Sequence, residues 1–150
     1  MFMKESILAE KSFDFSIRIV NLYKYLTDTK KEYVLSKQLL RSGTAIGALQ
    51  SEGSYAESKV DFIHKYGIAQ KECNETVYWL KLLYRTYYIN QKEFESLTND
   101  ATELMKIITA SIITAKKSLK KIMIIPSLPK TYKLPANKKY IGALHLKIQQ

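Results

Sequence analysis

Proline is absent from the first 125 residues of this 150-residue chain, and all three prolines, Pro126, Pro129 and Pro135, follow that stretch. Proline removes a backbone donor and breaks helices, so a segment without it can form long, unbroken helices. The length predicts one domain. The lone cysteine, Cys73, excludes an internal disulfide and is typical of a reducing compartment.

Apolar residues recur at three- and four-residue steps along four segments, as in amphipathic helices. The predicted helices cover about Ser6 to Thr27, Tyr33 to Gly53, Glu57 to Tyr88 and Asn90 to residue 123. Capping-box spacing appears at Ser54–Glu57 and at Asn90–Glu93. Short connections favour antiparallel neighbours. We therefore expect an all-α fold, an up-down-up-down antiparallel four-helix bundle over residues 1–123.

Residues 124–150 follow this bundle as a basic C-terminal tail, which we expect to be extended or partly ordered. Its Tyr140 to Ile148 segment is compatible with either a short helix or an edge strand.

Two glycines, Gly43 and Gly47, stand within the second predicted helix, where each costs about 1 kcal/mol relative to alanine. Close approach of a neighbouring helix would offset that cost. Gly53 occupies the position expected for a C-terminal cap. On the first helix, Phe13 and Ile17 widen the apolar stripe beyond what one core needs. Burial between subunits is a common use of such spare apolar surface.

Few residues suggest chemistry. His64 has Asp61 as a possible partner on the third helix, but a surface histidine with an ordinary ion pair is the favoured interpretation. Glu52 and Glu75 could face each other across the second and third helices, where a structural role answering Arg41 is favoured over catalysis. The ligand sets of zinc sites and the glycine-rich phosphate loops are missing. We expect no enzyme activity, no catalytic residues, no metal and no cofactor.

Aromatic residues gather near the end of the third helix. For this cluster, a place in the core or at a subunit interface is favoured over base stacking. Its members are Tyr78, Trp79, Tyr84, Tyr87 and Tyr88, with Arg85 beside them. Cys73 lies on the apolar stripe of the same helix, which favours a packed, unreactive thiol.

The net charge of +10 comes entirely from the last third of the chain. Residues 1–103 carry 14 basic and 14 acidic residues, whereas residues 104–150 carry ten lysines and no acidic residue. Such a basic end suits polyanions, because lysine near phosphate releases counterions. Helix capping and solvation are the alternative. The candidate nucleic-acid-binding residues are Lys116, Lys117, Lys120, Lys121, Lys130, Lys133, Lys138 and Lys139.

Two segments carry a family resemblance. They are RSGTAIGALQSEG, from Arg41 to Gly53, and DFIHKYGIAQKECNETVYWLKLL, from Asp61 to Leu83. In order and spacing, about residues 10–122 resemble the bacterial four-helix-bundle proteins encoded in ribosomal-RNA (23S rRNA) intervening sequences. That family is also similar to the accessory variability proteins of diversity-generating retroelements. The resemblance implies a homopentamer with a basic surface and no activity of its own.

The resemblance further implies nucleic-acid binding, RNA or DNA, or service as an accessory of a reverse transcriptase. The alternative is a protein-interaction scaffold whose basic tail docks an acidic partner protein, such as a polymerase surface. The N-terminus lacks an apolar run suited to a signal peptide. The most apolar stretch, Ile107 to Ala115, is too short to span a bilayer. We therefore expect a cytoplasmic protein without a membrane partner.

Overall fold

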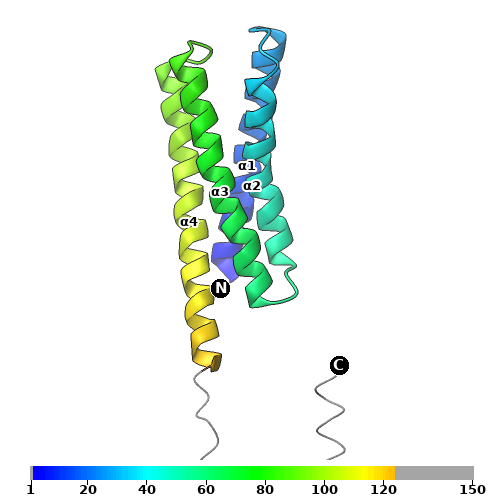
Figure 1. The fold of residues 1–150 in the computed structure, drawn as a ribbon, viewed down its shortest axis with the longest axis vertical. Helices are drawn as coiled ribbons and strands as arrows, with labels where there is room; N and C mark the ends of the chain where they lie inside the picture. The colour runs from blue at the N-terminus through cyan, green and yellow to red at the C-terminus, as the bar shows by residue number, and fades with distance from the viewer. Residues whose placement is uncertain (1, 124–150) are drawn as a thin grey trace, which may run out of the picture.

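Four helices form the described part of the molecule, and their packing confirms the predicted four-helix bundle. In the computed structural model the backbone is described for residues 2–123 and the side chains for residues 7–121. The helices are α1 (Phe2–Asp28), α2 (Leu35–Ser54), α3 (Lys59–Arg85) and α4 (Gln91–Met123). They run alternately up and down, so both the α2–α3 connection and the end of α4 lie at the lower end in Figure 1. The predicted tail lies outside the described residues.

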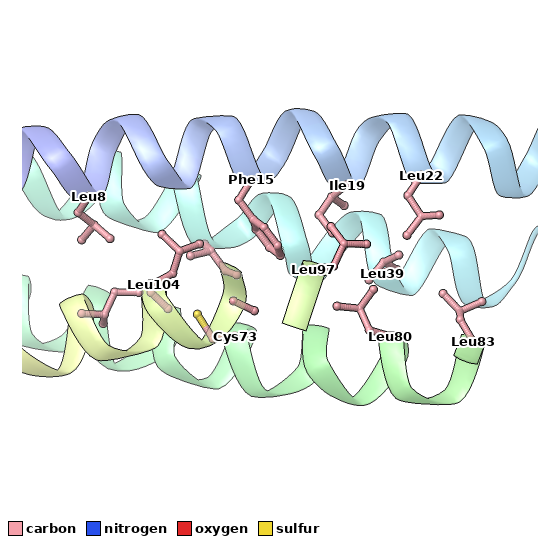
Figure 2. Packing of buried hydrophobic residues seen from close by; sticks show 14 of the residues in the cluster. Leu8, Phe15, Ile19, Leu22, Leu39, Cys73, Leu80, Leu83, Leu97 and Leu104 are labelled. Carbon is pink, nitrogen blue, oxygen red and sulfur yellow. The ribbon is translucent and has the colours of Figure 1, made fainter. Parts of the chain in front are cut away.

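The core is one continuous apolar cluster that runs the length of the bundle (Figure 2). The predicted stripes of α1 and α4 supply most of it, and every helix contributes fully buried side chains. Examples are Phe15, Ile19, Leu39, Ile46, Tyr66, Leu80, Leu104 and Ile108. Phe13 and Ile17, which widen the α1 stripe beyond what one core needs, lie outside this core and are 68% and 46% exposed. Tyr87 is 90% exposed because it falls in the α3–α4 connection after α3 has ended.

Close helix contacts explain the glycines of α2. A Cβ atom on Gly43 would lie 2.8 Å from Cγ1 of Ile19, and one on Gly47 would lie 3.3 Å from the backbone oxygen of Ser12. Both contacts are with α1, which confirms the predicted close approach. Gly53 is not a cap: it lies inside α2, and a Cβ there would meet the ring of Tyr66.

The helix starts are only partly as predicted. The capping box at Asn90 is confirmed, because the Asn90 side chain accepts from the Glu93 N–H at 2.9 Å and the Glu93 carboxylate accepts from the Asn90 N–H at 2.8 Å. The prediction of a capping box at Ser54–Glu57 is wrong. Ser54 still belongs to α2, and α3 is capped by Ser58, whose hydroxyl accepts from the Asp61 N–H at 3.1 Å.

Candidate nucleic-acid interface

The last turns of α4 present four lysines to solvent. Lys116, Lys117, Lys120 and Lys121 are all exposed, whereas Ala115 on the same helix is buried in the bundle. Lysine suits this position because the carbonyl end of a helix carries partial negative charge. No ion pair to any of the four is found among the side chains of residues 7–121. Their charge is therefore available to an external anion.

The first half of α4 differs, because two of its carboxylates are paired with α1. Lys11 Nζ lies 3.1 Å from Glu103 Oε1, and Arg18 pairs with Asp100. These two acidic side chains of α4 compensate cations of α1. The four exposed lysines lie beyond these pairs, where α4 ends at the bottom of Figure 1.

A fifth basic residue, Lys59, joins this end from another helix. Lys59 begins α3, and its Nζ hydrogen-bonds to Ser118 Oγ of α4. Sequence reasoning missed Lys59 because it belongs to the charge-neutral part of the chain. The signal was topological: in an up-down-up-down bundle, the start of the third helix lies at the same end as the finish of the fourth.

The remaining candidate lysines, Lys130, Lys133, Lys138 and Lys139, lie outside the described residues. The structure therefore places four of the eight predicted binding residues, and it brings those four together on two successive turns of one helix.

The carboxylates considered for chemistry lie in separate structural pairs. Glu52 accepts from Lys65 Nζ at 2.7 Å. Glu75 pairs with Arg41, and Glu75 also accepts from the Trp79 indole N–H at 3.1 Å. The hydrogen bond from Arg41, and to a smaller extent that from Trp79, holds the pKa of Glu75 below its ordinary value. The pairing of Glu75 with Arg41 agrees with the predicted structural role, although Arg41 and Glu75 lie at the surface and not in the core.

The other candidate side chains remain isolated. His64 is exposed on α3. Cys73 is buried, and this burial raises its pKa to about 12, as expected for a packed thiol. Within the described residues, no group of three or more histidine, cysteine, aspartate or glutamate side chains is placed to hold a metal ion. No helix in that part of the chain is long and apolar enough to cross a membrane.

The aromatic cluster is divided between core and surface. Tyr84 stacks on Phe94 with ring centroids 4.9 Å apart, which ties the end of α3 to the start of α4. Tyr78 is 58% exposed and meets Trp79 edge-on. Tyr84 therefore has the packing role that was favoured, while Tyr78 and Tyr87 remain at the surface.

The fold places the chain in the class of antiparallel four-helix bundles, here with four exposed lysines where the fourth helix ends. Residues 4–110 match the family model described as 23S rRNA-intervening sequence protein. The chain belongs to this family. It also resembles the crystal structure of a protein of unknown function from the S23 ribosomal protein family of Bacteroides thetaiotaomicron. The two sequences are 52% identical, with a TM-score of 0.72, covering 73% of this chain and 97% of that one. No curated protein matches the chain.

Proposed function

We propose that this protein is a non-catalytic, oligomeric nucleic-acid-binding bundle that contacts phosphates through the lysines at the end of α4. The observation that carries the proposal is the exposed set of Lys116, Lys117, Lys120 and Lys121, which form no ion pair with the side chains of residues 7–121. Such contacts supply affinity and position the ligand, but they read little sequence. The family description refers to 23S rRNA, which makes RNA the first ligand to test.

The same interface would suit an accessory protein of a reverse transcriptase, because the template of that enzyme is RNA. In this role the bundle would hold the template strand and leave the chemistry to its partner. The absence of acidic residues from position 104 onward supports contact along a continuous polyanion.

The test is binding of labelled RNA and DNA over a range of salt concentrations. We expect affinity to fall steeply with salt, and replacement of the four α4 lysines by glutamine to reduce the slope of log K against log salt by about 3 to 4. A matched control replaces Lys24, Lys37, Lys71 and Lys81, which are also exposed, and lowers the net charge equally.

Equal loss in both quadruple variants would mean that net charge alone drives binding. Absence of binding at low salt would overturn the proposal and favour a protein-interaction scaffold whose basic end docks an acidic protein. If a tested acidic protein then binds the wild type and not the variant that lacks the four α4 lysines, the scaffold role is identified.

Self-association is the second part of the proposal, and the outer face of α1 supports it. Phe13 and Ile17 are 68% and 46% exposed there. Beside Phe13, α1 and α2 form a groove of about 530 Å³, whose α2 side includes the small residues Gly47 and Ala48. Exposed aromatic and aliphatic side chains next to a groove of small residues are suited to burial against a second copy of the chain. The family resemblance implies five copies.

A further inference from the structure

A groove lies between α3 and α4 at the basic end. Its volume, about 420 Å³, falls within the range of about 300–1,000 Å³ that small-molecule sites occupy. Both apolar and polar residues line the groove. The apolar ones are Ala56, Phe62 and Ala115, and the polar ones are Ser58, Lys59, Thr114 and Ser118.

The aromatic ring in this groove, that of Phe62, is packed against a second ring. Phe62 packs against the buried Tyr66 with ring centroids 4.1 Å apart. The Ser118 hydroxyl accepts from Lys59 Nζ and keeps its proton for a further bond, and the Thr114 hydroxyl, which donates to the Ala110 carbonyl, can still accept one. A fixed aromatic ring with hydroxyls nearby is suited to a flat, polar-edged ring such as a nucleobase.

Cations border the groove on its α4 side. Lys117 follows Thr114 by three residues and Lys121 follows Ser118 by three, so each lies one turn beyond a lining residue. Lys59 reaches Ser118 from the opposite side. Two carboxylates, Glu57 and Asp61, belong to the α2–α3 connection and the start of α3. Phosphate contacts are therefore expected along the part of α4 after residue 103, where acidic residues are absent.

An exposed aromatic residue stands next to the groove. Tyr55 immediately precedes the lining residue Ala56 in the α2–α3 connection, and its side chain is 87% exposed. Little of this ring is used in packing the bundle. It offers a second stacking surface at the same end of the molecule as the lysines.

We propose that the basic end binds single-stranded nucleic acid in preference to a duplex, with an unpaired base in the α3–α4 groove and its flanking phosphates on Lys117 and Lys121. This inference rests on the proposed function and adds the strandedness of the ligand. Bases in a duplex are paired and stacked inside the helix, so they cannot enter the groove, whereas the bases of a single strand can turn outward.

Three labelled probes of equal length test this preference over one shared range of salt concentrations. They are oligothymidylate, its duplex with oligoadenylate, and an abasic deoxyribose-phosphate strand. We expect oligothymidylate to bind about tenfold more tightly than the abasic strand, because stacking of even one base supplies a gain of that size. The duplex should bind no more tightly than the abasic strand once its charge density is allowed for by the salt slope.

Matched variants place the effect in the groove. Thr114→Leu fills it without a change of charge, and Thr102→Leu is the control, since both threonines are exposed on α4 and donate to a carbonyl four residues earlier. Tyr55→Ala is paired with Tyr87→Ala at the opposite end of the bundle. We expect Thr114→Leu and Tyr55→Ala to weaken oligothymidylate several-fold and to leave the abasic strand unchanged.

The outcomes separate this inference from the proposed function. If all three probes bind with a steep salt dependence and equal affinity for the two single strands, the phosphate interface stands and the base groove is overturned. If no probe binds at low salt, both proposals fail. If the control variants weaken oligothymidylate as much as their partners do, the groove is also overturned, and thermal melting of each variant establishes that it is folded.

Discussion

At the scale of single residues, Glu32 shows how one side chain begins a helix from outside it. Its carboxylate accepts from the N–H groups of Val34, Leu35 and Ser36 at 3.0, 2.8 and 2.7 Å. Burial disfavours its charged form, but the bonds from Leu35, Ser36 and Val34 outweigh burial and hold its pKa below the ordinary value. Glu32 therefore satisfies donors that the first turn of α2 would leave unpaired.

The Glu32→Gln substitution should destabilise the bundle by about 1–3 kcal/mol at neutral pH, because it removes a charged acceptor from a buried site. A lowered folded pKa means that this stabilisation is present above the unfolded pKa, about 4.5, and is lost as pH falls through the folded value. Urea unfolding at neutral and acidic pH measures the difference. Glu57→Gln, at an exposed position in the α2–α3 connection, is the control; an equal loss there would contradict the prediction.

Substitution by alanine is expected to change stability in opposite directions at two glycines, Gly53 and Gly67. A Cβ at Gly53 would meet the Tyr66 ring, whereas one at Gly67 would find nothing within 4 Å. Gly53→Ala should therefore destabilise by about 1–3 kcal/mol through overpacking. Gly67→Ala should stabilise by about 0.5–1 kcal/mol, because alanine has the higher helix propensity. The denaturation midpoints of the two variants, compared with that of the wild type, test this prediction. A shift of the same sign in both variants would contradict it.

At the scale of elements, the sequence predicts the number, order and approximate span of the helices, since apolar periodicity reports directly which face is buried. The turn between α2 and α3 is less predictable. Ser54–Glu57 and Ser58–Asp61 both match the capping-box spacing, so local pattern cannot choose between them. Packing selects the second of these caps. Because Gly53 packs closely against Tyr66, α2 continues through Ser54, and Ser58 is the N-cap of α3.

The two serines provide a direct comparison. Ser58→Ala should cost about 1 kcal/mol of stability, the usual loss for an N-cap. The Ser54 hydroxyl donates to the Gln50 carbonyl and also accepts from the buried Gln50 side-chain amide at 2.9 Å, so Ser54→Ala is measured in a Gln50→Leu background. In that background it removes only a hydroxyl–carbonyl contact within one helix end and should cost clearly less. Thermal unfolding of both variants tests this order. A larger loss at Ser54 would restore the capping box that the pattern first indicated.

At the scale of the whole molecule, charge is arranged along the bundle axis. The sequence alone locates the four α4 lysines, because a run without acidic residues is visible in one dimension. The groove and the contribution of Lys59 require three dimensions, since they depend on which helix ends lie side by side. The exposure of Phe13, in contrast, agrees with the sequence, because Phe13 and Ile17 widen the α1 stripe beyond what one core needs.

Assembly is tested at this scale by molar mass in solution. We expect the wild type to have about five times the 17.4 kDa mass of one chain, and Phe13→Glu with Ile17→Glu to reduce that mass by placing charges in an apolar contact. Val34→Glu is the control, because Val34 is 71% exposed and lies outside the α1 face. A wild-type mass of a single chain, or an unchanged mass in the double variant, would contradict the assembly proposed here.

The buried position of Cys73 has a practical consequence for all of these measurements. Because it is the one thiol in the chain and lies in the centre of the core, a disulfide reagent can reach it only when the helices separate. Its modification rate under native conditions therefore records how often the bundle opens, and it requires neither denaturant nor an engineered label. The modification rate of Cys73 thus reports spontaneous unfolding, and a bound ligand that holds the helices together would lower that rate.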